Sequence, residues 1–387
     1  MLNQVLFKRL YNLWLHDRNN LKQKLRKKIR NKFPVDKMFF ESGKAMAPIN
    51  LTFEMTHLCN LSCYMCDLYG TDEDTSSPRS DFYRPNELLD LNDYQRIIDQ
   101  VKDFKPSISL TGGEPMLCPH TLPFIRMARD ADLVVTMVSN LTMMVGKEKE
   151  IVASGLQNLT CSIDGVGDDH DFVRGQKGTY DIFSQVFDTL IDEKKKAKTA
   201  LPTMQFNVTI TGRNQNKLLP ILNLAAEKGI TRVIFSHLWY WDAAMVEHHN
   251  RLYGDVAPVE LQNLKALEGL DVNILAEELE KIRAHSDFKK VDVKFLPDID
   301  NSQLGNYYHK SETQVRPSSH CLSPWMNTRV LPNGDVIPCI DSLWGNLKKD
   351  SFQETWNSKE ALRFRKALKE PGVFPGCMRC CGLYSYE

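Results

Sequence analysis

The chain has 387 residues, of which 42% are hydrophobic and 25% are charged, and its formal net charge at pH 7 is zero. This composition is ordinary for a globular protein with one main core and a smaller additional module. No apolar run approaches the roughly 18 residues of a membrane-spanning helix, and we expect no nucleic-acid partner.

The N-terminal segment 1–46 is strongly basic, with eleven lysines and arginines against two acidic residues within residues 1–37. Leu21, Leu25 and Ile29 recur at every fourth position, which predicts a basic amphipathic helical arm. Charges interrupt this segment too often for a signal peptide, so we expect a cytoplasmic protein whose cysteines stay reduced. The arm either docks on an anionic surface, such as the inner face of a membrane or an acidic partner, or packs against the rest of the chain with its basic face in water.

From residue 47 onward, predicted strands alternate with predicted helices. The strands are 49–56, 107–113, 133–140, 158–165, 204–211 and 232–240, and the helices lie near 92–104, 119–130, 145–154, 179–196, 216–228 and 273–285. Six βα units in series predict an α/β fold with a parallel sheet covered by helices, either as an open sheet or as a partial barrel. In such folds the chemistry lies at the carboxyl ends of the strands.

Three cysteines, Cys59, Cys63 and Cys66, directly follow the first predicted strand. Thiolates on one short loop can bind three irons of a [4Fe–4S] cluster and leave the fourth iron open, whereas structural clusters usually have four protein ligands. An open iron can bind a substrate or a cofactor. The residues alone leave two alternatives, a zinc site with His57 as the neighbouring fourth ligand or buried thiols with unrelated roles.

The next strands also end in residues that suit ligand binding. Gly112 and Gly113 lack a Cβ atom, so a ligand can approach the backbone closely, and Glu114 can accept a hydrogen bond from an ammonium group. Further polar side chains lie at the ends of the third and fourth strands, namely Ser139, Asn140, Ser162 and Asp164. These groups can bind ribose hydroxyls or a carboxylate, or they can serve only as caps of the strand ends.

The CxxxCxxC loop at 59–66, the GGEP sequence at 112–115 and the SIDG sequence at 162–165 together resemble the radical S-adenosylmethionine (SAM) enzyme family. The resemblance covers residues 47–300 and implies a partial (β/α)6 TIM-like barrel. It implies that SAM chelates the open iron of a catalytic [4Fe–4S] cluster through its amino and carboxylate groups. It also implies that a reduced flavodoxin- or ferredoxin-type donor drives cleavage of SAM to methionine and a 5′-deoxyadenosyl radical, which abstracts a hydrogen atom from the substrate.

The same resemblance implies SAM-binding roles for individual residues. Glu114 would bind the amino group of SAM, and Arg174 matches an arginine that often approaches the SAM carboxylate in this family. Met65 stands where the family usually has an aromatic residue near the adenine, and its apolar, polarizable side chain can fill that role.

Four further cysteines lie near the other end of the chain, at Cys321, Cys339, Cys377 and Cys380. The NGDV sequence at 333–336 predicts a β-hairpin between the first two, and residues 352–369 predict a helix before the last pair. A hairpin, a helix and a CxxC turn within 301–387 have too little core to be stable alone. This module therefore needs a covalent or metal cross-link.

This segment resembles the SPASM/twitch auxiliary-cluster domain that follows the barrel in many radical SAM enzymes. The spacing from Cys321 to Cys339 matches one half of the SPASM pattern, but the other half breaks off after Cys380, because its next ligand would fall at Tyr386. The resemblance therefore implies one auxiliary [4Fe–4S] cluster rather than two, with zinc as the alternative metal. The spacing leaves open whether Cys380 or Cys381 is the last ligand.

Together these features predict an oxidoreductase that abstracts hydrogen from an unactivated C–H bond. If the auxiliary cluster accepts the electron left on the substrate radical, the outcome is an oxidation or a cross-link. The alternatives are a redox-neutral epimerase or rearrangement enzyme with a structural auxiliary cluster, and a metal-dependent binding module without turnover.

The substrate is less well defined by the sequence. The arm is too short for the peptide-recognition domain of many peptide-modifying relatives, which favours a small-molecule, sugar or lipid-linked substrate over a peptide. The segment 240–272 and the adjoining Trp239, with Tyr240, Trp241 and His249, either line the substrate pocket or form the core of a domain interface.

Overall fold

The computed structural model describes residues 42–66, 87–261, 264–309 and 320–380. Most of the predicted basic arm lies outside these ranges, so its structure and its docking surface stay predictions. Within the described ranges, none of the helices combines the length and the apolar character that crossing a membrane requires.

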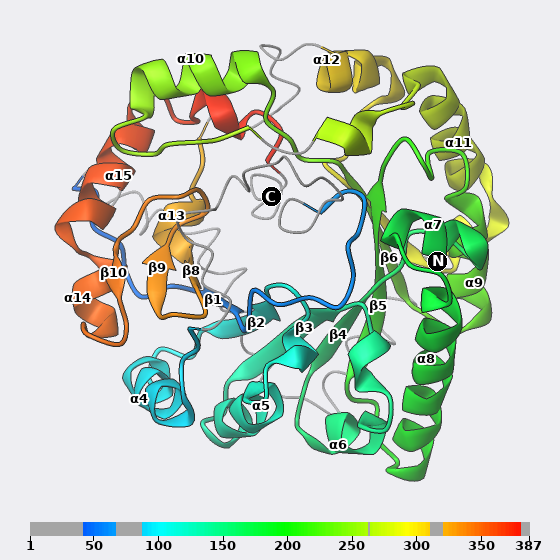
Figure 1. Ribbon diagram of the computed structural model, residues 1–387, viewed down its shortest axis with the longest axis horizontal. Helices are drawn as coiled ribbons and strands as arrows, with labels where there is room; N and C mark the ends of the chain where they lie inside the picture. Colours follow the sequence, from blue (N-terminus) through cyan, green and yellow to red (C-terminus); the bar gives the residue numbers. More distant parts are fainter. Residues whose placement is uncertain (1–41, 67–86, 262–263, 310–319, 381–387) are drawn as a thin grey trace.

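One curved sheet of ten strands forms the centre of the described structure (Figure 1). In spatial order it runs β10-β9-β8-β1-β2-β3-β4-β5-β6-β7. The strands are β1 (Asn50–Glu54), β2 (Ser107–Thr111), β3 (Val134–Ser139), β4 (Asn158–Ser162), β5 (Thr203–Ile210), β6 (Arg232–His237), β7 (Asp292–Leu296), β8 (Asn327–Val330), β9 (Asp335–Ile337) and β10 (Gly345–Asn346). All six predicted strands are therefore present, and they pair in parallel in chain order.

Helices such as α4 (Leu91–Val101), α5 (Thr121–Asp130), α6 (Glu148–Ala153), α8 (Thr179–Lys196) and α9 (Leu219–Glu227) lie on the outer side of this sheet (Figure 1). The other α-helices of the described residues are α7 (Asp168–Arg174), α10 (Ala243–Tyr253), α11 (Val272–Ala284), α12 (Leu304–His309), α13 (Ser323–Met326), α14 (Phe352–Trp356) and α15 (Lys359–Lys369). The six predicted barrel helices correspond to α4, α5, α6, α8, α9 and α11. The prediction did not include α7 or α10, which interrupt the regular alternation.

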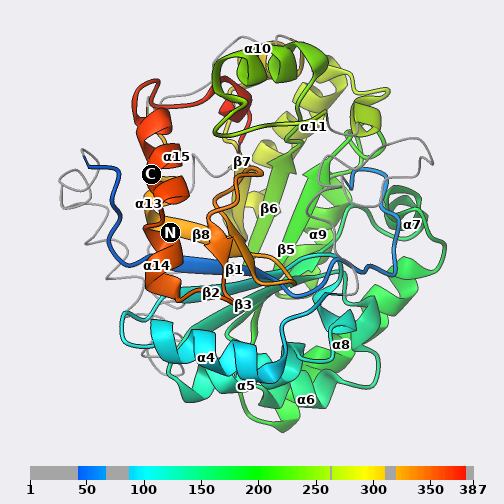
Figure 2. The same ribbon diagram turned by 60° about the vertical axis from the view of Figure 1, so that its left-hand side comes forward.

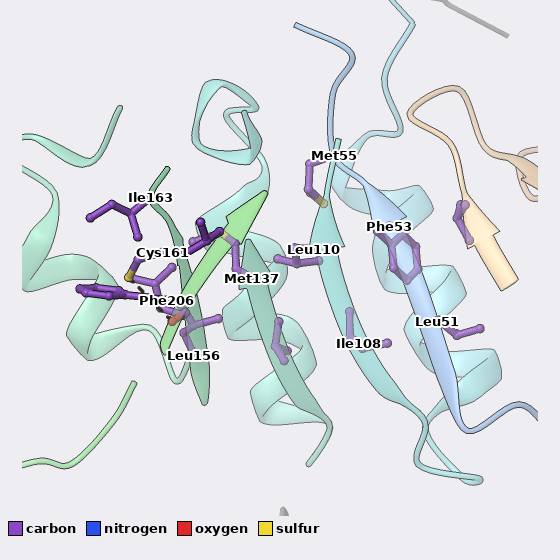
Figure 3. Close-up of a cluster of buried hydrophobic side chains, with 14 of the residues drawn as sticks. Leu51, Phe53, Met55, Ile108, Leu110, Met137, Leu156, Cys161, Ile163 and Phe206 are labelled. Carbon is purple, nitrogen blue, oxygen red and sulfur yellow. Dashed lines mark hydrogen bonds between the residues drawn. The ribbon is translucent and has the colours of Figure 1, made fainter. Parts of the chain in front are cut away.

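The two faces of the sheet differ in polarity because the side chains of a strand alternate. On β2, Ile108 and Leu110 are fully buried under the helices, while Ser109 on the opposite face is only partly buried. Figure 3 shows the outward-facing side chains of β1 to β5 as one continuous apolar layer. The concave inner face instead carries hydroxyl and amide groups, such as Gln205, whose Nε2 donates to Thr160 Oγ1 at 3.0 Å.

Two strands extend the parallel sheet beyond the predicted six. β7 pairs in parallel with β6, and β8 pairs in parallel with the opposite edge, at β1. β8 and β9 form the antiparallel hairpin predicted from the NGDV sequence, so the hairpin is part of the barrel sheet and not a separate unit. The main core likewise includes residues of both segments.

The predicted helix 352–369 consists of two helices, α14 and α15. Asn357 separates them, and its side chain exchanges hydrogen bonds with the backbone of Ala45 at 2.9 and 3.0 Å. Ser358 then caps α15 by accepting from Ala361 N at 3.2 Å. Figure 2 shows both helices beside β8 and β1, so the interruption ties the start of the described chain to the C-terminal segment.

Candidate active site

The loop that carries Cys59, Cys63 and Cys66 begins at the carboxyl end of β1, as predicted. A turn closes its end, because Cys66 N donates to Cys63 O at 2.9 Å. Cys63 is buried and the other two are partly exposed, and all three are thiols. Burial raises the pKa of the Cys59 thiol, and Cys63 and Glu114 lie near enough to add to the rise.

Gly112 and Gly113 hold this loop against the end of β2. Gly113 N donates to Thr56 O at 2.8 Å, and Glu114 N donates to Leu58 O at 2.9 Å. A Cβ atom on Gly113 would lie 2.1 Å from Leu58 O, and one on Gly112, where φ is +124°, would lie 2.4 Å from Thr56 O. The glycines thus allow a close approach between two backbones, and their contact with SAM stays a prediction.

Glu114 joins the ends of β2 and β3 beneath the cysteine loop. Its buried carboxylate accepts from Ser139 Oγ at 2.8 Å, Asn140 N at 3.0 Å and Met116 N at 3.1 Å. Burial raises the pKa of Glu114, while these hydrogen bonds oppose the rise. Because a carboxylate has about four acceptor positions, one remains for a further donor.

The polar side chains after β3 also contact the cysteine loop directly. Asn140 Nδ2 donates to Asn60 Oδ1 at 3.2 Å, and Asn60 Nδ2 donates to Thr142 Oγ1 at 2.8 Å. Ser139 and Asn140 therefore connect the end of β3 to the cysteine loop through Glu114 and Asn60, and their predicted contact with a ligand stays a prediction.

Arg174, at the end of α7, connects β4 with the cysteine loop. One guanidinium nitrogen, Nη2, lies 2.7 Å from Asp164 Oδ2, and the other, Nη1, lies 3.7 Å from Cys63 Sγ. Burial lowers the pKa of Arg174, but Asp164 and Cys63 outweigh this effect and raise it above its usual value, so the side chain is a permanent cation. Asp164 also accepts from Thr209 N at 2.7 Å.

Two predicted SAM-binding residues lie beside this network. Ser162 is partly exposed and pairs in register with Asn207 of β5. Met65 is partly buried and packs against the small cluster of Tyr64 and Leu238.

The second set of cysteines gathers at the hairpin and the end of the described chain. Burial raises the pKa of Cys339 well above its usual value, and the Cys321 and Cys380 thiols lie close enough to add to the rise. Cys380 N donates to Cys377 O at 3.1 Å within the CxxC turn, and Cys321 N donates to Gly372 O at 2.8 Å, which ties Cys321 to the segment that leads into this turn. Cys381 lies outside the described residues.

A buried arginine within the CxxC turn anchors it to the barrel. Arg379 Nε donates to Tyr307 O at 2.6 Å, and its guanidinium carbon lies 4.5 Å from the centroid of the Tyr240 ring. Trp241 Nε1 donates to Gly376 O in the same turn. The aromatic residues after β6 therefore form an interface with the second cysteine set.

The sequence analysis did not identify a second buried charged group, which lies at the start of the cysteine loop. Glu54, the last residue of β1, forms an ion pair with Arg329 of β8, and Glu54 Oε2 lies 3.2 Å from His57 Nε2. The exposed fractions of these side chains are 1% for Glu54, 4% for His57 and 24% for Arg329. A glutamate on the polar face of the first strand was the only sequence signal for it.

The donor sets suit iron–sulfur clusters. Within the described ranges, no three His, Cys, Asp or Glu side chains lie close enough to bind one metal ion. Thiolates in a cluster each bind a different iron, and an adjacent guanidinium such as Arg174 stabilises an anionic cluster. The binding of the SAM ammonium by Glu114 stays a prediction.

Family models match both segments of the chain. The radical SAM superfamily model matches residues 53–234, and a SPASM model, described as an iron–sulfur cluster-binding domain, matches residues 321–381. The first range contains the cysteine loop and the SIDG sequence, and the second contains the C-terminal cysteines.

Several curated proteins are similar in sequence. The chain is 25% identical over 346 residues to the AdoMet-dependent heme synthase of Methanosarcina barkeri, and this alignment covers 88% of this chain and 89% of the synthase. It is 23% identical over 359 residues to the PqqA peptide cyclase of Xanthomonas euvesicatoria, and that alignment covers 86% of this chain and 81% of the cyclase. The match to the pre-heme d1 synthase of Dinoroseobacter shibae, at 28% identity, spans only 43% of that relative.

Solved structures share the fold. Streptococcus suis SuiB bound to the precursor peptide SuiA aligns with a TM-score of 0.57 at 13% identity, over 89% of this chain and 78% of that one. The structure of anSMEcpe with bound AdoMet aligns with a TM-score of 0.56 at 16% identity, over 82% of this chain and 80% of the anSMEcpe chain. These similarities confirm the predicted partial barrel with a small C-terminal cluster domain. The chain is therefore an enzyme of the radical SAM superfamily with a SPASM-type domain, and its cofactors are SAM, a catalytic [4Fe–4S] cluster and an auxiliary iron–sulfur cluster.

Proposed function

We propose that this enzyme oxidises or cross-links its substrate at an unactivated C–H bond, with its two clusters held by two separate cysteine sets. The catalytic set is Cys59, Cys63 and Cys66, and the auxiliary set is Cys321, Cys339, Cys377 and Cys380. The observation that carries the first assignment is the position of Arg174, which bridges Asp164 and Cys63 at 2.7 and 3.7 Å. This bridge joins the CxxxCxxC and SIDG motifs at one edge of the sheet.

When bound, the catalytic cluster and SAM supply the 5′-deoxyadenosyl radical that removes a hydrogen atom from the substrate. The protein's own groups would orient SAM. Glu114 would hold its ammonium through the acceptor position that Ser139, Asn140 and Met116 leave. Arg174 would balance negative charge beside Cys63, and Met65 would lie against the adenine. Ser139, Asn140, Ser162 and Asp164 would complete the polar surroundings of SAM.

The auxiliary set has four thiolates, which leaves no iron open to the substrate. We therefore assign this cluster to electron transfer, as the acceptor of the electron left on the substrate radical. The anchoring of Arg379 under Tyr240 and Tyr307 supports this role, because it fixes the second set against the end of β6.

We favour a small-molecule, sugar or lipid-linked substrate. The inner face of the sheet carries partly exposed neutral hydroxyl and amide groups, among them Asn158, Gln205 and Asn207. Such groups pair with substrate hydroxyls without needing a counter-charge. A peptide is the alternative, since the PqqA peptide cyclase is among the similar proteins.

The test uses anaerobically reconstituted protein with SAM, a chemical reductant and candidate small-molecule, sugar and lipid-linked substrates. Wild-type protein should contain about eight irons, as two [4Fe–4S] clusters require, and should form 5′-deoxyadenosine. A Cys321→Ala, Cys339→Ala variant should lose about half of the iron, keep SAM cleavage and yield little product per SAM consumed. Cys118→Ala, which removes a cysteine outside both sets, is the control. Normal product formation by the double variant would contradict the electron-transfer role and leave the auxiliary cluster with a structural role.

A further inference from the structure

The turn between Cys63 and Cys66 is fixed through Tyr64, its first residue. Tyr64 N donates to Val173 O of α7 at 3.1 Å, and the Tyr64 hydroxyl donates to Lys265 O. The residue is only 4% exposed, so its ring is enclosed by protein. Because Tyr64 directly follows Cys63 in the chain, the position of its ring limits where the second thiol of the cysteine loop can lie.

A planar cation lies against this ring. Arg213 lies just after β5, and its guanidinium carbon is 3.5 Å from the centroid of the Tyr64 ring and 4.3 Å from the centroid of the Phe172 ring. Arg213 Nη1 also donates to Phe172 O at 3.0 Å. A guanidinium at such distances is attracted to the faces of aromatic rings. Arg213 therefore joins the cysteine loop both to α7 and to the end of β5.

The end of α7 also contacts the two preceding residues of the loop. Arg174 Nη1 lies 3.7 Å from Cys63 Sγ. A Cβ atom on Gly175, where φ is +73°, would lie 2.6 Å from Ser62 O, so the two backbones approach closely at this point. The end of α7 thus holds this part of the loop, and Arg213 adds a contact to the aromatic side chain from the β5 side.

We propose that Arg213 is a positioning residue, which holds the segment from Cys63 to Cys66 in the conformation that binds the catalytic cluster. This inference rests on the proposed ligand set of that cluster, and it adds a residue from the loop after β5. Arg213 acts through the flat shape of its guanidinium, which contacts both rings, and not through its charge alone. A lysine would keep the charge but could not stack on the rings in this way.

The experiment follows the catalytic cluster of the reduced, reconstituted protein by electron paramagnetic resonance while a ferrous chelator removes iron. The catalytic signal is the one that changes when SAM is added and that is missing when Cys59, Cys63 and Cys66 are all alanine. In Arg213→Gln this signal should change shape before the chelator is added, because the thiolates are held less firmly, and it should decay about tenfold faster than in wild type. Arg213→Lys should behave like Arg213→Gln. The auxiliary signal should keep its wild-type shape and rate of loss in both variants.

Phe172→Leu removes one of the two rings, and because this residue is 56% exposed the variant should fold and should show a smaller increase in the rate of decay. It replaces Arg213→Gln in the test if that variant takes up no catalytic iron. The matched control is Arg363→Gln, which removes an exposed arginine paired with Asp255. Decay of the test variant at the Arg363→Gln rate, or a wild-type rate in Arg213→Lys, overturns the inference alone. A SAM-sensitive signal that persists without the three cysteines overturns the proposed ligand set, and the inference with it.

Discussion

Gly113 lies where the end of β2 meets the cysteine loop, and the absence of a side chain lets the two backbones approach each other closely. Its amide donates to Thr56 O at 2.8 Å while Leu58 O occupies the space that a Cβ atom would need. Backbone atoms at both positions cannot move away as a flexible side chain could. The position of Cys59, one residue after Leu58, therefore depends on glycine at this site.

We predict that Gly113→Ala displaces the cysteine loop and prevents assembly of the catalytic cluster. The added Cβ atom would lie 2.1 Å from Leu58 O, far inside van der Waals contact. Iron analysis of the reconstituted variant should give roughly half of the wild-type content, because the auxiliary cluster remains. Gly305→Ala, in α12 with no atom within 4 Å of the new methyl, should keep full iron content. Full iron in both variants would contradict this account of the loop.

The sequence suggests candidate ligand residues but not the buried ion pair that the structure places beside the cysteine loop. Cys59, Glu114 and Arg174 lie in or near short motifs that follow successive strands, and the order of these motifs indicates the resemblance to the radical SAM family. Arg329 and Glu54 are 275 residues apart, and a single sequence does not indicate that two such distant residues pair. Candidate site residues could therefore be named where they belong to local motifs, and not where distant strands bring them together.

At the scale of elements, the junction between β6 and α12 holds the C-terminal cysteines in place. His237 ends β6, and its Nδ1 lies 2.8 Å from Tyr308 Oη in α12. The neighbouring Tyr307 donates to Leu238 O at 3.0 Å and accepts from Arg379 through its carbonyl. Helix α12 thus connects the end of a barrel strand with the CxxC turn.

Acid should weaken this junction. Burial lowers the pKa of His237 to about 3, whereas the unfolded chain has the ordinary value of about 6.5. Below pH 6.5 only the unfolded state takes up the proton, so the free energy of unfolding falls as pH decreases towards 3. When the pH falls from 7.5 to 5.5, this histidine alone should lower the free energy of unfolding by about 1.4 kcal/mol.

Anaerobic urea unfolding at these two pH values measures the effect. His237→Gln keeps a hydrogen-bonding side chain but cannot titrate, so its loss of stability should be smaller than that of wild type by about 1.4 kcal/mol. The exposed His248→Gln is the control. Equal pH dependence in wild type and His237→Gln would show that His237 is not held neutral.

At the scale of the whole molecule, both segments that carry cysteines contribute strands to the one sheet of the described residues. The six strands could be predicted because each has its own local signal, and with the helices between them they indicated a parallel sheet, open or closed into a partial barrel. The partial barrel itself was implied by the resemblance to the radical SAM family. β7 and β8 lacked such a signal: β7 mixes charged and apolar residues as Asp292–Leu296, and β8 has only four residues. The pairing of β8 with β1 is a tertiary contact that propensity cannot predict, and it makes the C-terminal segment part of the barrel.

The central claim is that the three cysteines after β1 hold the catalytic cluster while the C-terminal set holds a separate one. Its most direct test is 5′-deoxyadenosine formation by a variant in which Cys59, Cys63 and Cys66 are replaced by alanine. Anaerobically reconstituted, this variant should retain about four irons in the auxiliary cluster and form no 5′-deoxyadenosine from SAM under reducing conditions. If the triple variant still cleaves SAM, the catalytic cluster lies elsewhere and the account is wrong.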